Sequence, residues 1–199
     1  MTFALPALPE PDGATPRLIS TRNELRSAVG GNLKRIGRKG SRYAFDFVMP
    51  RMGYSDSLAF IRLRSEDGLV SIRVPQHDLE IGTPGAVIRV NGAGQAGASL
   101  DADGFTPAYA MRQGQLLTHF PVTGPRRIYC CVEEAQANDL GQMTIPLETM
   151  LGVPPSDGDL IEVGDPTIEG FAIFDPSIWT TDFAREVGLS FSIEEPGDG

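Results

Sequence analysis

The sequence predicts an all-β protein with one short helix. Glycine and proline, at 23 and 16 of the 199 residues, are spread along the chain and favour many short elements joined by turns. Apolar and polar residues alternate in several runs, which is the period of a strand with one buried face. The composition, 41% hydrophobic and 22% charged, is that of an ordinary globular protein. We therefore expect a folded chain of short strands with a buried core.

The first 16 residues, MTFALPALPEPDGATP, contain four prolines. Proline fixes φ and removes a backbone donor, so residues 1–16 predict an extended arm and exclude a helix or a central strand. A disordered tail is the alternative. Phe3, Leu5 and Leu8 favour an arm that packs on a neighbouring subunit.

Strands are expected from residue 17, beginning with LISTR and continuing around Leu33 and Ile36. Tyr43, Phe45 and Phe47 then alternate with smaller or polar residues, which predicts a core strand with one aromatic face.

One short helix should follow this strand. Ser55 or Asp56 is a suitable N-cap, Leu58 and Ile61, with Phe60, supply an apolar face, and Gly68 is placed to end the helix. We expect the helix to cover one side of a sheet, with the next strand over 69–74.

A second β unit is expected over residues 86–166. Residues 76–86 have the composition of a loop, and short apolar runs follow at 87–90, 116–120, 128–132, 143–145 and 160–163. Turn sequences separate most of these runs, and no helical pattern lies between them, which is typical of a small antiparallel module.

The last strand should return to the first unit. Residues 187–193, VGLSFSI, alternate strictly and need a partner, for which the N-terminal sheet is the obvious choice. We therefore expect a first β domain over 17–85 plus 167–195, the inserted module over 86–166, and a polar tail at 196–199.

Charge is distributed unevenly along the chain. Residues 17–64 hold eleven Lys and Arg against three acidic residues, a net charge of +8, whereas residues 130–199 hold fifteen acidic residues against Arg185 alone, or −14. Such a chain suits head-to-tail association. The candidate subunit-interface residues are Lys34, Arg35, Arg38, Lys39, Arg42, Glu133, Glu134, Asp157 and Asp159.

Two other interpretations of this charge pattern remain open. Two solvated faces of a single domain would fit it equally well. Nucleic-acid binding by the basic end is the weaker interpretation, because the chain carries a net −9 and the basic segment has no interleaved aromatic residues.

The sequence contains no pattern that predicts an enzyme, a metal site or a cofactor. His77 and His119 are too few for a usual metal site, and no nucleophile signature stands near His77-Asp78. Gly92, Gly94 and Gly97 spell a loose nucleotide motif, but turn residues follow where a helix would have to begin.

Two further sets of residues also favour an ordinary structural role. The adjacent Cys130 and Cys131 are expected to be free thiols, and the acidic pairs Glu133-Glu134 and Asp157/Asp159 lack the spacing of a calcium loop. No apolar run approaches membrane-spanning length, so we expect no membrane insertion and synthesis in the cytoplasm.

The chain resembles the distal tail, or minor tail, proteins of long flexible-tailed bacteriophages. The most specific segment is RVNGAGQAGASLDADGF at 89–105, followed by Gly104–Phe105–Thr106–Pro107. Gly114-Gln115-Leu116, Gly141–Leu147 (GQMTIPL) and Asp157–Val163 follow in the order of the family. The resemblance covers roughly residues 17–195 and rests on the order of several weak motifs.

The resemblance implies a structural virion protein without catalysis. Such proteins have a belt-type β-sandwich or split barrel carrying an inserted β module, and they form a ring, usually of six subunits. The ring connects the tail tube protein to the baseplate hub protein and sometimes carries receptor-binding or side-fibre proteins. The chain would then lie in the tail tip of the virion, and in the host cytoplasm during assembly. Reversing Arg35, Arg38 and Lys39 to Glu should block ring closure.

The alternative is a carbohydrate- or receptor-binding module at the tail tip, formed by residues 86–166. Sugar sites use aromatic platforms, and this segment offers Phe105, Tyr109, Phe120 and Tyr129 but no tryptophan. The adaptor interpretation is therefore preferred.

Overall fold

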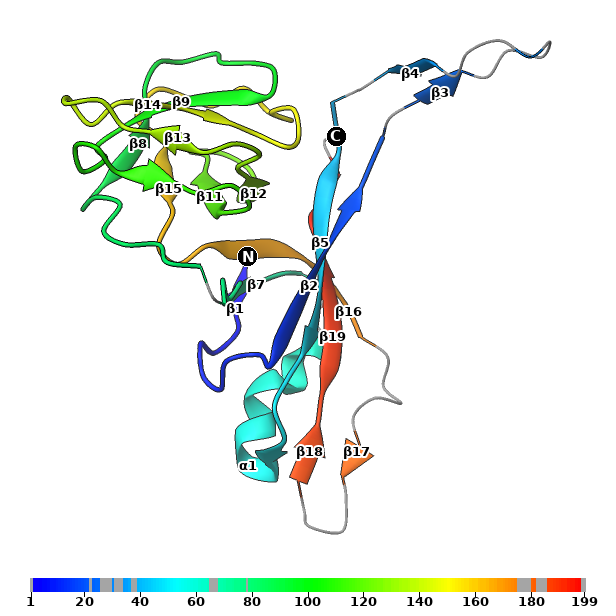
Figure 1. Ribbon diagram of the computed structural model, residues 1–199. Coiled ribbons are helices and arrows are strands. Elements are labelled where there is room, and N and C mark those ends of the chain that lie inside the picture. Colours follow the sequence, from blue (N-terminus) through cyan, green and yellow to red (C-terminus); the bar gives the residue numbers. More distant parts are fainter. Residues whose placement is uncertain are drawn as a thin grey trace.

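The chain is mostly strand, with one short helix and curled sheets that include a half-barrel, so the expected all-β class is confirmed. The computed structural model describes residues 2–21, 23–25, 30, 34–36, 39–64, 68–77, 79–174, 180–181 and 186–197. Figure 1 shows two bodies: a long sheet built from both ends of the chain, and a smaller unit built from its middle.

The first sheet has six strands in the order β1-β7-β16-β19-β5-β2. They are β1 (Phe3–Ala4), β2 (Gly13–Ile19), β5 (Arg42–Val48), β7 (Leu69–Arg73), β16 (Thr167–Ile173) and β19 (Ser190–Glu194). β1 runs parallel to β7, and every other pair in this sheet is antiparallel. The last strand pairs with β5 and β16, which confirms the expected return of the C-terminal strand to the N-terminal sheet.

The N-terminal segment belongs to this sheet at both of its edges. β2 begins at Gly13, so the boundary expected at residue 16 falls inside a strand, and Pro16 lies on the edge, where a missing N–H is tolerated. Leu5 is buried in the first core, with Phe3 packed against it. The expectation that these two residues pack on a neighbour is therefore wrong, and among the three apolar residues Leu8 alone is exposed, at 76%.

Two small β elements lie at opposite ends of the first sheet. β3 (Asn23–Leu25) and β4 (Lys34–Ile36) pair antiparallel and project beyond β2 and β5, away from both bodies (Figure 1). At the other end, β6 (Met52–Gly53), β17 (Thr180–Thr181) and β18 (Glu186–Gly188) form a three-stranded sheet beside the helix.

The helix is shorter and more tightly wound than the sequence predicts. α1 (Tyr54–Ser57) continues as a 3₁₀ helix over Leu58–Arg64, and Gly53 precedes it without a side-chain cap. At three residues per turn, Ser57, Phe60 and Leu63 fall on one face, and all three are buried. Leu58, expected on the apolar face, is 40% exposed because it lies off this three-residue spacing.

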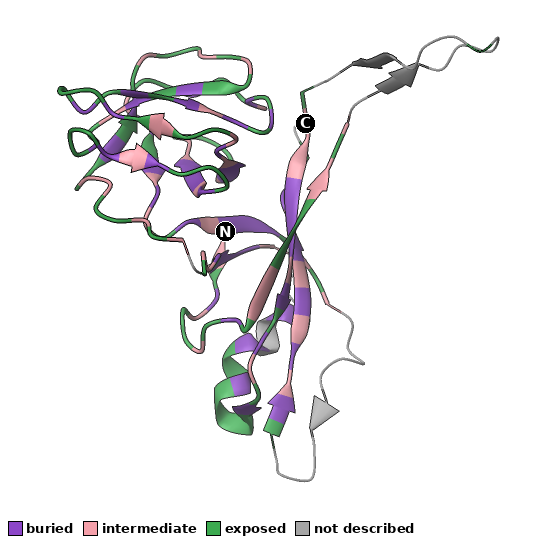
Figure 2. Ribbon diagram, viewed as in Figure 1, coloured by how far each residue is buried: buried purple, intermediate pink, exposed green. Residues whose placement is uncertain are grey.

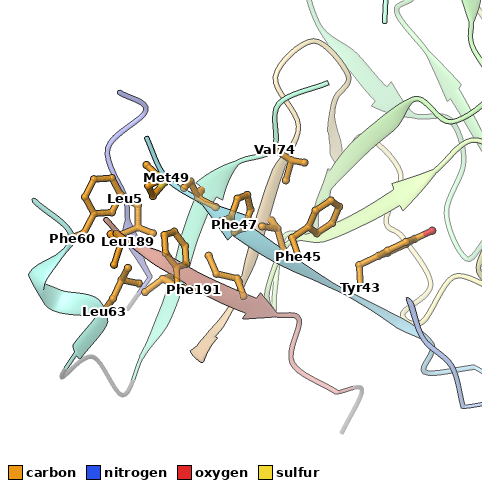
Figure 3. Packing of buried hydrophobic residues seen from close by; sticks show 14 of the residues in the cluster. Leu5, Tyr43, Phe45, Phe47, Met49, Phe60, Leu63, Val74, Leu189 and Phe191 are labelled. Atoms are coloured by element: carbon orange, nitrogen blue, oxygen red, sulfur yellow. The ribbon is translucent and has the colours of Figure 1, made fainter. Parts of the chain in front are cut away.

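The first core contains a row of aromatic rings, as the alternation in β5 predicts. Phe47 stacks on Phe45 at 6.1 Å and on Phe191 at 5.4 Å, and Phe60 from the helix lies 6.4 Å from Phe191. Figure 3 shows Tyr43 at the end of this row, with its hydroxyl directed away from the other rings. The core therefore extends from the helix to the second unit.

The second sheet also has six strands, in the order β12-β11-β15-β8-β9-β14, all antiparallel. They are β8 (Ile88–Val90), β9 (Ser99–Asp103), β11 (Leu116–Phe120), β12 (Arg127–Cys130), β14 (Met143–Pro146) and β15 (Leu160–Glu162). β10 (Ala110–Met111) pairs with β13 (Ala135–Gln136) beside it. Figure 2 shows buried residues alternating with exposed ones along several strands of this unit.

Two glycines of the family-like motifs meet at Phe105. Gly104 and Gly141 have φ values of +86° and +73°, and a Cβ on Gly141 would lie 2.3 Å from the carbonyl oxygen of Phe105. The backbone N of Phe105 donates to the carbonyl of Gly141 at 3.1 Å. Only glycine fits at this contact without displacing the backbone.

The loop between β8 and β9 is longer than the two-residue turn that Asn91-Gly92 suggests. It is held by Gln95, whose amide nitrogen donates to the carbonyls of Asn91, Gly92 and Asp101 at 2.9 to 3.0 Å. The Gln95 carbonyl in turn accepts from the Asp101 backbone N at 2.7 Å. The glutamine of the GQ motif therefore has a structural role in fixing this loop.

Candidate functional site

A distinctive surface feature is the pair of strands β3 and β4, which project from the first sheet (Figure 1) and belong to residues 20–41, here called the basic hairpin. Its sequence, STRNELRSAVGGNLKRIGRKGS, holds six Lys and Arg and one Glu. Thr21 ties its base together, because its backbone N donates to Ser41 Oγ at 3.3 Å and its hydroxyl donates to the Lys39 carbonyl at 3.0 Å. The sequence of this segment is therefore rich in positive charge.

Four of the five cationic interface candidates belong to the sequence of this segment, and three of them are among its described residues. Lys34 and Arg35 are in β4, Lys39 is exposed in the turn before β5, and Arg38 lies outside the described residues. Arg42 differs, because it donates to Glu194 Oε1 at 2.6 and 3.1 Å and both side chains are about three-quarters buried. Its charge is already balanced within the chain.

Of the four acidic interface candidates, three are exposed and one, Asp159, is buried. Glu133, Glu134 and Asp157 are exposed, although Glu134 pairs with Arg112 at 2.9 Å and Asp157 accepts from the Gly92 backbone N at 2.8 Å. The described partners of Glu134 and Asp157 thus both lie in the second unit.

Asp159 has to be corrected as an interface candidate. It is 4% exposed, and its Oδ2 lies 2.8 Å from His119 Nε2 and accepts from the Ser156 backbone N at 2.8 Å. A solvated loop carboxylate was expected there, but the turn folds Asp159 inward onto the buried histidine. Burial lowers the pKa of His119, and the nearby Asp159 raises it by less. A neutral histidine that donates to a carboxylate is the arrangement that suits this core.

A groove of about 580 Å³ lies between the two bodies. Buried Tyr43, Phe45 and Val74 form its floor, and the more exposed lining residues come from β2, from the 75–79 loop and from the second unit. These are Ala14, Pro16, Pro75, Gln76, His77, Leu79, Gln113, Gly114, Leu116, Cys130 and Glu148. Its volume is within the range of binding sites, roughly 300–1,000 Å³.

Polar groups stand at two places in this groove. The Tyr43 hydroxyl donates to Glu148 Oε2, and burial together with this carboxylate raises the pKa of Tyr43. Gln76 Oε1 accepts from the Leu116 backbone N at 2.7 Å, whereas its Nε2 is buried without a hydrogen-bond partner. A buried donor without an acceptor costs stability.

The cysteines have no nucleophilic character. Burial, with smaller contributions from Glu148 and Cys131, raises the pKa of the Cys130 thiol to about 11. Burial also raises the pKa of Cys131, whose sulfur is 2.9 Å from the Glu133 carbonyl. Both groups are therefore protonated thiols at neutral pH.

The two bodies are joined by the buried carboxylate of Glu195. Glu195 is 3% exposed and accepts from the backbone N of Tyr43 at 2.9 Å and of Ile128 at 2.7 Å. One signal could have found it: Leu189, Phe191 and Ile193 face inward at alternate positions, and Glu195 is next in that series.

No family model matches the chain, and no curated protein matches it. Within the described ranges, no group of three or more His, Cys, Asp or Glu side chains is arranged to hold a metal ion. The described helical segments include none long and apolar enough to cross a bilayer.

Proposed function

We propose that this chain is a distal tail protein of a long flexible-tailed bacteriophage, and that its copies form a ring between the tail tube and the baseplate hub. The basic hairpin carries this proposal. Its sequence holds six Lys and Arg, and its described strands β3 and β4 project from the first sheet, whereas the C-terminal 70 residues are strongly acidic. Opposite charges at different places on one surface favour heterologous contacts, which close into a ring when the rotation between copies allows it.

The resemblance in motif order supports the same assignment. Gly104 and Gly141 fit close backbone contacts in the second unit, and Gln95 holds a loop there by hydrogen bonds. The segments that carry the resemblance therefore contain residues that the fold requires. A sheet built from both ends of the chain, with a second β unit between them, is the layout that a belt domain with an inserted module requires. The proposed partners are other copies of this chain, the tail tube protein and the hub protein, and the role is structural.

Carbohydrate binding by the second unit is the second candidate function. A hollow of about 270 Å³ is lined by the polar residues Asn91, Asp101, Asn138, Gln142 and Thr144. Their side chains already pair with one another, Asn138 with Gln142 and Thr144 with Asp101, and the lining includes no aromatic platform. Binding of the full chain to a glycan array would favour this candidate over the adaptor.

The adaptor proposal is tested by the mass of the purified chain in light scattering at low and at moderate salt. A discrete species several times 21.4 kDa, weakened by salt, is expected because its contacts are electrostatic. Arg35→Glu with Lys39→Glu should prevent this species from forming. The control, Arg51→Glu with Arg89→Glu, changes the same number of cations at two exposed positions outside the basic hairpin and should leave the mass unchanged. A wild-type species that is insensitive to both salt and hairpin reversal would contradict the electrostatic contact.

A further inference from the structure

We infer that Asn91 is a site of spontaneous deamidation, and that the carboxylate of Asp157 accepts the proton that Gly92 gives up in this reaction. The co-reactant is water, and the product is an aspartyl or isoaspartyl residue at position 91. The inference concerns the loop between β8 and β9 and is independent of the proposed ring.

The reaction uses two neighbouring groups of the chain. The backbone nitrogen of Gly92 forms a bond to Asn91 Cγ, which closes a five-membered succinimide ring. The bond from Cγ to Nδ2 breaks, and ammonia leaves with the proton that the Gly92 nitrogen has lost. Water then opens the ring at Cγ to give aspartate, or at the backbone carbonyl to give isoaspartate. No electrons are transferred, so neither an oxidant nor a reductant is needed.

The side chain of Asn91 is free to react. Asn91 is exposed, and its side-chain amide makes no hydrogen bond within the described part of the chain. The residue that follows it is a glycine, which has no Cβ to obstruct the attack of its own nitrogen. Both conditions for closing the succinimide ring are therefore met at this position.

Asn138, another exposed asparagine of the second unit, differs in both respects. Its Oδ1 accepts from the backbone N of Leu140 at 3.0 Å and of Gln142 at 2.9 Å, and its Nδ2 donates to Gln142 Oε1 at 3.2 Å. The residue that follows it is Asp139, whose side chain crowds the attacking nitrogen. Asn138 therefore provides an unreactive comparison within the same chain.

Asp157 lies at the atom that has to lose a proton. The backbone N–H of Gly92 donates to Asp157 Oδ1 at 2.8 Å, within the heavy-atom reach that a general base needs. The turn that carries Asp157 is fixed to β8, because the backbone N of Gly158 donates to the Val90 carbonyl at 3.0 Å. The fold thus holds a carboxylate against the attacking nitrogen.

The modification would alter both the charge and the backbone of the loop. A carboxylate at position 91 adds negative charge beside Asp101, since both residues line the polar hollow of the second unit. An isoaspartyl linkage also lengthens the backbone between residues 91 and 92, whose carbonyls Gln95 Nε2 binds at 2.9 and 3.0 Å. Deamidation should therefore make the hollow more anionic and loosen the loop.

The test follows aspartate and isoaspartate at position 91 by peptide mapping and mass spectrometry, while the full chain is kept in neutral buffer. Asn91 should convert in the folded wild type, whereas Asn138 should remain an amide over the same period. Asn91→Gln is the control, because its longer side chain cannot close a five-membered ring, and it should show no conversion. A folded wild type in which Asn91 is as stable as Asn138 overturns the inference.

A second comparison tests the role of Asp157. Asp157→Ser removes the carboxylate at an exposed position, so folding should be unaffected. Conversion at position 91 should then be slower by about tenfold or more, since a positioned base usually contributes at least that much. Unfolding the wild type in urea removes the same contact and should also slow the conversion. A rate in Asp157→Ser that equals or exceeds that of the wild type, or a faster conversion in urea, overturns Asp157 as the proton acceptor.

Discussion

Removing the buried carboxylate of Glu195 should destabilise the chain and loosen the contact between its two bodies. The carboxylate accepts from the backbone N–H groups of Tyr43 in the first sheet and Ile128 in the second. Glu195→Ala leaves both donors buried without these acceptors. At about 1–3 kcal/mol for each orphaned group, the free energy of unfolding should fall by about 2–6 kcal/mol. Glu195→Gln keeps the shape and one acceptor, so its cost should be about 1–3 kcal/mol.

Urea denaturation followed by circular dichroism measures this loss directly, with Glu133→Ala as an exposed control that should change stability by less than about 0.5 kcal/mol. Hydrogen exchange adds the local readout, because the amides of Tyr43 and Ile128 should lose protection together in Glu195→Ala. If that variant unfolded within about 0.5 kcal/mol of the wild type, the bridging role of the carboxylate would be refuted.

Three further outcomes follow from the described contacts. Gly141→Ala should cost more than about 2 kcal/mol in urea midpoint analysis, because its Cβ meets the Phe105 carbonyl oxygen at 2.3 Å and φ is +73°; Gly94→Ala, at a φ of +71° in open space, should cost less. Phe47→Ala should cost about 3–5 kcal/mol by the same assay, since its ring is buried between two others, and a loss below 1 kcal/mol would contradict that packing. Burial lowers the pKa of His119 from 6.5, so the unfolded chain binds more protons between the folded-state pKa and 6.5, and stability should fall as the pH falls through that window. The urea midpoint measured from pH 7.5 downward should fall less steeply in His119→Gln, and identical slopes would contradict the assignment.

Local patterns in the sequence predict the strands best. The aromatic alternation at 43–47 and the apolar alternation at 187–193 give both the strands and their buried faces, because each face is fixed by a period of two. The helix is predicted less well. Its 3₁₀ geometry leaves Leu58 exposed and buries Phe60 and Leu63 at a three-residue spacing, and the sequence gives no local signal for that winding; the side chain of Ile61 is outside the described part of the chain.

The candidate site is harder to predict, because it is assembled from distant segments. The groove is lined by residues as far apart in the sequence as Ala14 and Glu148, and no local pattern predicts that they line the same groove. Asp159 and Glu195 have the neighbours of solvated residues, yet both are buried, since one folds onto His119 and the other continues the inward series of the last strand. The charge of the basic hairpin, by contrast, is evident in the sequence alone.

Electron microscopy of the purified wild-type protein at low salt tests the central claim most directly. Closed rings of uniform diameter with a central hole are predicted, and they should be absent from the same preparation of Arg35→Glu with Lys39→Glu. A field of single particles no larger than one 21.4 kDa chain, or of open filaments without rings, would contradict the proposal that this chain closes into a ring.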